Sequence, residues 1–188
     1  FEKDLPGQNS TGFSADAEIS KLPLEMCDTI GIDWGYNGTE TEKDFKSVKQ
    51  LIGLLVNAAG NNANFLLNVG PTAQGTIQPE FVERLEKVGQ WMDANGESIY
   101  GTRGGPMPPQ AWGCMTHKNG TLYVHLLDAK PGDLLTLPGT EGLRVKKAHL
   151  LAGKTPVTVE AKGDLALTVP SVLSDVNDTV VVIETDGK

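Results

Sequence analysis

The residues best suited to chemistry lie in one short segment, WGYNGTETE, which runs from Trp34 to Glu42. The segment carries two aromatic side chains, Trp34 and Tyr36, the amide of Asn37, and the carboxyl groups of Glu40 and Glu42. This mixture of aromatic rings, amide and carboxylates suits the binding of a sugar. A carboxyl group in such a segment can also donate or accept a proton during bond cleavage.

The elements that flank this segment are predicted to be strands. Residues 26–34, MCDTIGIDW, form a short strand pattern, and residues 65–69 form a continuous apolar run that only Asn68 interrupts. A continuous run of this kind is typical of a strand buried on both faces, as in a parallel sheet covered by helices. Because the active site of a βα barrel lies at the carboxyl ends of its strands, chemistry is expected after Trp34 and after Asn68.

Two helices are predicted around the second of these strands. Over residues 45–59 apolar side chains recur at steps of three and four, which is the pattern of one apolar helix face. Thr41 is the expected N-cap of this helix. A second helix is predicted over residues 79–94, with a proline at its first position. The order strand, helix, strand, helix over residues 25–100 favours α/β units with a parallel sheet.

The character of the sequence changes near Pro106. GGPMPPQ is a linker by composition, and beyond it short runs rich in β-branched residues are separated by turns. Asn119-Gly120 stands between two such runs, which is the strongest short signal for a hairpin, and KGD at 162–164 marks another. Short strands at regular spacing predict an antiparallel β-sandwich. The sequence therefore predicts two domains, residues 1–105 and 106–188.

Three phrases in the first part of the chain resemble one enzyme family. NFLLNVGP, GTI and NGESIYGT, all within residues 64–102, are similar to the end of the catalytic barrel of α-L-fucosidases of glycoside hydrolase family 29. The resemblance is dense over about residues 24–106. It implies the fold class α/β plus all-β: the terminal βα units of a (β/α)8-like barrel in residues 1–105, then an antiparallel β-sandwich in residues 106–188.

The resemblance implies a retaining exo-α-L-fucosidase, which removes terminal α-L-fucose from glycoconjugates by double displacement. It places Glu40 as the acid/base, because in this family that carboxylate falls shortly after a G-Y-N-like turn. Glu42, Glu25 and Asp28 stay open as alternatives, since the position varies within the family. The nucleophilic aspartate would lie before Phe1, and the reaction needs neither a cofactor nor a metal.

Four side chains are expected to contact the sugar. Trp34 and Tyr36 lie in the loop, and Asn68 lies near the end of the second strand. Phe65, together with Trp34, offers an apolar patch for the fucose methyl group. Structural roles remain open beside these: Trp34 could pack in the core, Tyr36 could cap its turn, and Asn68 could satisfy backbone groups. Glu40 could equally be a solvated residue at a helix start.

The bulk composition excludes several classes of partner. The net charge of −8 argues against nucleic acid, which binds clustered lysine and arginine. No apolar run approaches the roughly 20 residues of a membrane helix, so no membrane partner is expected. The three histidines are too far apart in the sequence for a metal motif. The resemblance is compatible with a secreted, periplasmic or lysosomal location.

The resemblance also implies a partner polypeptide. Two βα units cannot close a barrel, so the chain is expected to be stable only with the N-terminal half of the same enzyme, and to act on a fucosylated oligosaccharide or glycoconjugate. Two alternative functions stay open. One is a non-catalytic carbohydrate-binding or interaction module formed by the β-sandwich, whose rings are Trp112 and Tyr123. The other is a different barrel glycosidase.

Overall fold

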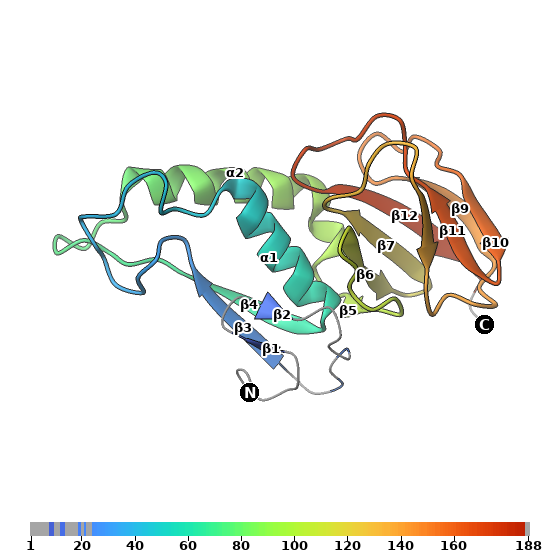
Figure 1. Ribbon diagram of the computed structural model, residues 1–188, viewed down its shortest axis with the longest axis horizontal. Coiled ribbons are helices and arrows are strands. Elements are labelled where there is room, and N and C mark those ends of the chain that lie inside the picture. Colours follow the sequence, from blue (N-terminus) through green and yellow to red (C-terminus); the bar gives the residue numbers. More distant parts are fainter. Residues whose placement is uncertain (1–7, 10–11, 14–18, 20, 22–23, 187–188) are drawn as a thin grey trace.

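The structure is a computed structural model that describes residues 8–9, 12–13, 19, 21 and 24–186. Within these residues two α-helices lie between a parallel pair of strands and a larger antiparallel assembly (Figure 1). A short antiparallel hairpin, β1 (Gln8–Asn9) and β2 (Gly12–Phe13), precedes them in the chain. The helices therefore contact sheets on two sides.

A strand–helix–strand unit forms the first layer of this arrangement. β3 (Leu24–Thr29) and β4 (Ala63–Asn68) pair in parallel over their full lengths, and α1 (Val48–Gly60) connects them. Parallel neighbours need a long crossover, which the helix provides. The parallel βαβ unit that the sequence predicted is thus confirmed.

The two faces of the β3–β4 pair have different environments. Successive residues of a strand point to opposite faces, and residues that pair in register share a face. Leu67 packs into a core formed with α1 and α2, so Phe65 and its partner Met26 share that face. Leu66 and its partner Cys27 point the other way, and Leu66 is 43% exposed. Helices cover one face of the pair, and the described residues leave the other face open.

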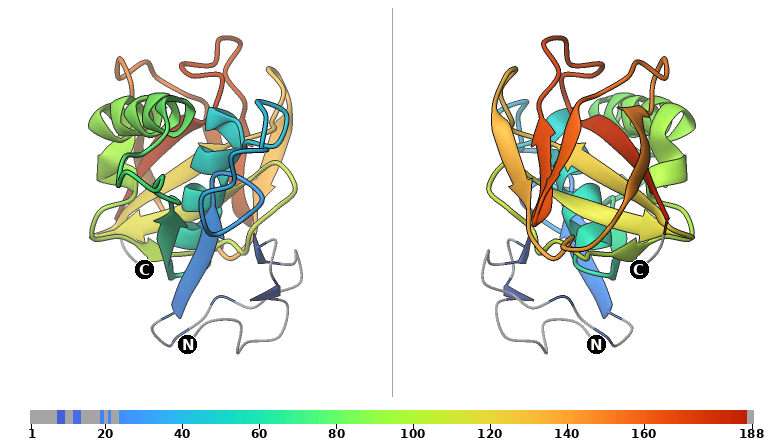
Figure 2. Two further views of the ribbon diagram at one scale, coloured as in Figure 1. Left: turned by 90° about the vertical axis from the view of Figure 1, so that its left-hand side faces the viewer. Right: turned by 90° about the vertical axis from the view of Figure 1, so that its right-hand side faces the viewer.

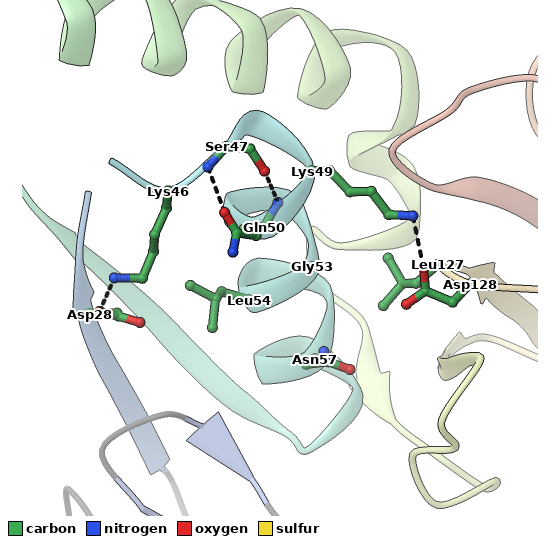
Figure 3. Close-up of a pocket in the computed structure, with 10 residues that line it drawn as sticks. All are labelled: Asp28, Lys46, Ser47, Lys49, Gln50, Gly53, Leu54, Asn57, Leu127 and Asp128. Carbon is green, nitrogen blue, oxygen red and sulfur yellow. Dashed lines mark hydrogen bonds and ion pairs between the residues drawn. The ribbon is translucent and has the colours of Figure 1, made fainter. Parts of the chain in front are cut away.

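α1 begins with a complete capping box at its first turn. The Ser47 hydroxyl accepts a hydrogen bond from the backbone N–H of Gln50, and the Gln50 side chain accepts one from the backbone N–H of Ser47 (Figure 3). This pair satisfies two N–H groups that would otherwise lack a partner at the helix start. The apolar face of α1 is then buried at Leu51, Ile52 and Val56.

The predicted N-cap at Thr41 is wrong, because that residue closes a separate turn before the helix. The N–H and hydroxyl of Thr41 both donate to the Asp44 carboxylate, at 2.8 and 2.9 Å, and these bonds lower the pKa of Asp44. The chain cannot continue from this turn into α1, since the backbone N–H of Lys46 donates to the carbonyl of Ile30 rather than to the preceding turn. A contact between distant residues therefore decided where the helix begins.

α2 (Pro79–Asn95) agrees with the prediction to within a residue. Proline occupies its first turn, and the helix continues into a 3-10 turn, η1 (Gly96–Ser98). Phe81 and Trp91 are buried on its inner face. Phe81 meets Phe45 edge to face, with ring centroids 5.1 Å apart. This contact fixes the loop before α1 against the second helix.

The second part of the fold consists of two antiparallel sheets with a shared core. The larger sheet has the order β5-β6-β7-β12-β9 and the smaller one β10-β11-β8. Buried side chains of both sheets fill the space between them, which makes this part the β-sandwich that the strand pattern predicted. The strands are β5 (Arg103–Gly104), β6 (Gly113–Lys118), β7 (Thr121–Leu126), β8 (Leu134–Leu137), β9 (Val145–Leu150), β10 (Val159–Lys162), β11 (Asp164–Thr168) and β12 (Thr179–Thr185).

The larger sheet is buried on both of its faces. On β7, Leu122 and Val124 join the core shared with the smaller sheet. The alternate residue, Tyr123, packs in a second core with Ile52 of α1 and Trp91 of α2. The two end-on views show the helices against the larger sheet, opposite the smaller one (Figure 2). This double burial explains why the sequence of β7 is apolar at most positions rather than alternating.

Two predicted hairpins are confirmed by their backbone angles. Asn119 and Gly120, between β6 and β7, have φ of 50° and 79°. Positive φ at both central residues is what a type I′ turn requires, and Asn-Gly adopts it at low cost. Gly163, between β10 and β11, has φ of 86°.

The fold class matches the sequence in its coarse form, a parallel α/β unit followed by an antiparallel sandwich. The described residues contain no closed barrel. The domain boundary between residues 105 and 106 stays a prediction; β5, just before it, is an edge strand of the larger sheet. Neither helix in the described part is long and apolar enough to cross a bilayer.

Candidate active site

The loop after β3 carries most of the side chains that the sequence indicated. β3 ends at Thr29, so the predicted strand end at Trp34 is wrong, and both Trp34 and Tyr36 lie in the loop. Their side chains are 54% and 50% exposed, which excludes the core role considered for Trp34. After the strand ends, Ile30 is buried and Ile32 is 66% exposed. The loops after β3 and β4 lie together at the left of Figure 1.

Glu40 folds back onto this loop and is half-buried. Its Oε1 atom accepts hydrogen bonds from the backbone N–H groups of Ile32, at 2.6 Å, and Asp33, at 3.1 Å. Its Oε2 atom accepts none from the described residues. One oxygen of the carboxyl group is therefore fixed by the backbone, and the other is available to a ligand.

Gly31 makes this position of Glu40 possible. A Cβ atom added at Gly31 would stand 2.6 Å from both carboxylate oxygens of Glu40, which is far inside van der Waals contact. Only glycine lets the carboxylate approach the backbone so closely. The G-I-D-W phrase therefore contains a residue that the Glu40 site requires, although nothing in its sequence context identifies it.

Asn68 ties the ends of the two parallel strands together. Its side-chain amide donates to the carbonyl of Trp34 at 2.7 Å and to the hydroxyl of Thr29 at 3.2 Å. The Thr29 hydroxyl in turn lies 3.3 Å from the carbonyl of Asp33. These bonds support the structural role considered for Asn68, that of satisfying backbone groups. They also hold the loop that presents Trp34.

The loop after β4 touches the loop after β3 at two glycines. A Cβ atom added at Gly70 would stand 2.5 Å from the backbone nitrogen of Tyr36 and 2.5 Å from the carbonyl carbon of Gly35. The V-G-P phrase after β4 is thus a close backbone contact. It couples the position of Tyr36 to the second strand.

A cleft of about 420 Å³ opens between these two loops. Tyr36, Asn37 and Glu40 line one wall, and Thr72 and Gln78 line the other. The Asn37 side chain is itself fixed, since its amide donates to Asp33 and its oxygen accepts from the backbone of Thr39. The cleft therefore combines the carboxyl groups of Glu40, Glu42 and Glu80 with aromatic rings and several hydroxyl and amide groups, which are the contacts that a sugar can use.

Glu42, the first alternative to Glu40, is occupied by an ion pair. Its carboxylate lies 2.5 Å from the guanidinium of Arg84. Arg84 is 8% exposed, and it also donates to the backbone carbonyls of Lys46, at 2.8 Å, and Glu80, at 3.0 Å. Its guanidinium carbon stands 5.3 Å from the centre of the Phe45 ring. Arg84 thus connects α2 to the loop before α1, and the ion pair with Glu42 is part of this connection. No pattern in the sequence indicated this role of Arg84.

Asp28 and Glu25, the remaining alternatives, lie away from the cleft that holds Glu40. Asp28 pairs with Lys46 at 3.0 Å in a separate hollow along α1, where Lys49 also pairs with Asp128 (Figure 3). Glu25 is exposed near the start of β3, at the opposite end from the loop. Of the four carboxylates, only Glu40 and Glu42 line the cleft at the strand ends.

Phe65 is separated from the other sugar-binding candidates. It points to the helix face of β4, whereas Asn68 lies an odd number of residues away and points to the opposite face. Phe65 lines another cleft, at the start of β4. A continuous apolar run does not show which face each residue takes, so the sequence could not separate the two residues.

The described residues contain no group of three or more histidine, cysteine, aspartate or glutamate side chains arranged to hold a metal ion. Two of the three histidines, His125 and His149, are buried in the larger sheet. Burial and two nearby lysines, Lys154 and Lys147, lower the pKa of His149.

The described residues thus combine a parallel βαβ unit, a cleft with carboxyl groups at its strand ends and an antiparallel β-sandwich. A family model described as Alpha-L-fucosidase matches residues 2–97. An α-L-fucosidase of Dictyostelium discoideum is 35% identical over 151 residues, which cover 79% of this chain. The chain belongs to the α-L-fucosidase family.

Solved structures of the same family have this fold. α-L-Fucosidase isoenzyme 1 of Paenibacillus thiaminolyticus superposes with a TM-score of 0.79 over 99% of this chain, at 35% identity. A GH29 α-L-fucosidase of Bacteroides thetaiotaomicron, trapped as a covalent intermediate with 2-fluoro-fucosyl fluoride, superposes with a TM-score of 0.77 over 88%, at 25% identity.

This chain spans only part of each of these proteins. It covers 33% of the Dictyostelium relative, 44% of the Paenibacillus chain and 38% of the Bacteroides chain.

Proposed function

We propose that this chain forms the C-terminal part of a retaining exo-α-L-fucosidase, with Glu40 as its acid/base. The observation that carries the proposal is the half-buried carboxyl group of Glu40 at the mouth of a parallel βαβ unit in a chain of this family. In this proposal β3 and β4 are the last strands of a (β/α)8 barrel, whose active site lies at the carboxyl ends of its strands.

The hydrogen bonds of Glu40 suit the two halves of a double displacement. Two backbone N–H groups donate to Oε1, so the acidic proton resides on Oε2, the oxygen without a bond from the described residues. Oε2 then protonates the departing glycosidic oxygen while a carboxylate from elsewhere in the enzyme attacks the anomeric carbon. In the second half Oε2 takes a proton from water, which attacks the covalent intermediate and releases fucose.

The substrate class follows from the family and from the side chains around the cleft. The Bacteroides relative was trapped with a fluorinated fucosyl donor, which is the expected behaviour of a retaining enzyme. In this chain the half-exposed ring of Tyr36, which lines the cleft, and that of Trp34, which lies in the same loop, provide apolar surface for the fucose ring and its methyl group. We therefore infer a terminal α-L-fucose of an oligosaccharide or glycoconjugate as substrate. No cofactor takes part in this reaction.

In this proposal the attacking carboxylate comes from polypeptide outside the described residues. The open face of the β3–β4 pair, with Leu66 43% exposed, suits the strands of the N-terminal half of the same enzyme. Size-exclusion chromatography with intact-mass analysis tests this assembly. A longer chain or a two-chain complex supports it, and a well-behaved monomer of 20.0 kDa with full fucosidase activity contradicts it.

Kinetics with two leaving groups test the role of Glu40 in the complete enzyme. Glu40→Gln should lower kcat/KM for a fucosyl disaccharide by at least about 100-fold, which is the lower range for loss of general acid–base catalysis. An aryl fucoside with an acidic phenol should lose much less in its first step, since that phenol leaves without a proton. Azide should restore turnover, because it attacks the intermediate without help from a base.

Glu42→Gln serves as the matched control, since it removes a carboxylate two residues away that lines the same cleft. It should leave the dependence on the leaving group unchanged. If azide restores the turnover of Glu42→Gln but not that of Glu40→Gln, then Glu42 rather than Glu40 is the acid/base. If neither variant changes the kinetics, the acid/base lies elsewhere.

The alternative function, a carbohydrate-binding β-sandwich, would need exposed aromatic rings on which a sugar could pack. Tyr123 is 4% exposed and packs against the helices, and Trp112 packs partly buried on the core of the sandwich. Neither ring lies open on the surface as a sugar platform would.

A further inference from the structure

A second cleft lies at the start of β4, at the end of the strand opposite to the Glu40 loop. Its volume is about 350 Å³, and it is lined by α1, by the start of β4 and by the segment 99–103 that leads into the sandwich. β4 has six residues, so the two clefts are separated by roughly 20 Å along the strand. None of its lining residues belongs to the cleft that holds Glu40.

Tyr100 gives this cleft an exposed aromatic wall. Its side chain is 68% exposed, the largest exposure of any described aromatic residue. The ring lies over Gly96, where an added Cβ would stand 3.0 Å from its Cε2 atom. The backbone of Tyr100 is fixed as well, since its N–H donates to the carbonyl of Gly96 and its carbonyl accepts from Lys118 at 3.2 Å. The backbone bonds thus hold Tyr100 in place, and its exposed ring lies beside Gly96.

The walls that face Tyr100 are also fixed in place. A Cβ atom added at Gly104 would stand 2.3 Å from the carbonyl oxygen of Gly60 and 2.8 Å from the backbone nitrogen of Asn62. The segment after Tyr100 therefore lies directly against the turn between α1 and β4. The cleft is built into the fold, since its shape depends on backbone contacts.

One charged side chain of the cleft, that of Arg103, is available to a ligand. Arg103 is exposed, and its guanidinium makes no hydrogen bond or ion pair within the described residues. Arg103 is the sole charged residue among the described residues that line the cleft. The chain as a whole carries a net charge of −8, but the lining of this cleft carries one positive charge and no negative charge. The cleft is therefore electrostatically suited to an anion.

We propose that this cleft binds a carboxylate-bearing sugar residue. The apolar face of the pyranose packs on the ring of Tyr100, as ring CH groups do on an aromatic surface. The carboxylate accepts a pair of hydrogen bonds from the guanidinium of Arg103, the geometry in which arginine and carboxylate match best. The site is independent of the fucosidase proposal and holds an acidic unit of a glycan without cleaving it.

Titration of the full chain, followed by protein NMR or calorimetry, tests the site. The probes are 3′-sialyllactose with lactose as its neutral control, and glucuronate with glucose as its neutral control. The two acidic sugars distinguish a sialic acid from a uronic acid as the source of the carboxylate. At least one acidic sugar should bind saturably and at least about tenfold more tightly than its control, which is the effect expected of one charge-assisted pair.

Variants of the two walls locate the binding. Arg103→Gln and Tyr100→Ala should each weaken binding of the acidic sugar by about tenfold or more, whereas Tyr100→Phe should keep it. Arg144→Gln removes another exposed arginine, on the sandwich, and should leave binding within about twofold. Tyr36→Ala, at the Glu40 cleft, should also leave it unchanged. Because these side chains are exposed, all variants should melt at the temperature of the parent chain.

Three results would overturn the proposal. The first is the absence of saturable binding by either acidic sugar. The second is equal binding of an acidic sugar and its neutral control. The third is a loss of binding in Tyr36→Ala or Arg144→Gln that matches the loss in Tyr100→Ala or Arg103→Gln.

Discussion

Removing the carboxylate of Asp178 tests how strongly the buried contact with His125 holds the larger sheet together. His125 Nδ1 and Asp178 Oδ2 are 2.6 Å apart, and both side chains are 0% exposed. His125 points to the helix side of β7, with its ring centroid 6.5 Å from that of Trp91. Asp178→Ala leaves the His125 ring buried without a partner. Breaking a buried pair in this way costs about 3–5 kcal/mol.

An exposed pair of nearly the same length provides the control. Lys146 and Asp186 are 2.5 Å apart, but their side chains are 53% and 59% exposed. Asp186→Ala should cost less than about 1 kcal/mol, since water replaces the lost partner. The two substitutions differ mainly in burial, so the difference between their free energies of unfolding measures what burial adds.

The double substitution His125→Leu with Asp178→Ala sharpens this prediction. Within the described residues, His125 Nε2 and Asp178 Oδ1 already lack hydrogen-bond partners, so removing both polar groups removes two unsatisfied atoms as well as the pair. The double variant should therefore be less destabilised than either single variant.

Urea and thermal unfolding, followed by circular dichroism, measure these effects. For a chain of this size, 1 kcal/mol corresponds to roughly 2–4 °C, so Asp178→Ala should lower the Tm by about 6–20 °C. The reasoning is refuted if Asp178→Ala and Asp186→Ala cost the same, or if the effects of the two single substitutions in the buried pair simply add.

Three further predictions follow from close contacts and perturbed groups. Gly70→Ala places a Cβ 2.5 Å from the backbone nitrogen of Tyr36, so it should lower the free energy of unfolding in urea by about 1–3 kcal/mol. It should also lower the fucosidase activity of the complete enzyme, and unchanged activity would show that the position of this loop is not required. Burial and the Glu97 carboxylate raise the pKa of Tyr123 to about 12 from its usual 10.0. Because the folded state keeps the proton, the free energy of unfolding should fall as pH rises between about 10 and 12, and Tyr123→Phe should make that fall less steep; an unchanged slope would contradict this. Burial also raises the pKa of the Cys114 thiol, so in the native protein Cys114 should resist a thiol reagent until urea unfolds the chain, and rapid native labelling would contradict this.

Elements with local signals were predictable from the sequence. The Asn119-Gly120 turn and the proline at the start of α2 specify their own backbone geometry, so the hairpin and the helix form where the pattern placed them. The antiparallel sandwich followed from the spacing of short strands. The family resemblance selected Glu40 from four carboxylates, and the structure puts that residue at the mouth of the parallel pair.

Features that depend on contacts between distant residues were decided only by the tertiary structure. α1 begins at Val48, later than predicted, because the backbone N–H of Lys46 donates to the carbonyl of Ile30. The side chain of Phe65 points to the helix face of β4, away from the predicted sugar-binding residues. The contacts that Arg84 makes with the loop before α1, and the close backbone contacts at Gly31 and Gly70, likewise could not be predicted from the sequence. Turns and caps depend on neighbouring residues, which a sequence displays directly. The face that a strand residue takes, and the partner that a charge finds, depend on segments brought together by folding.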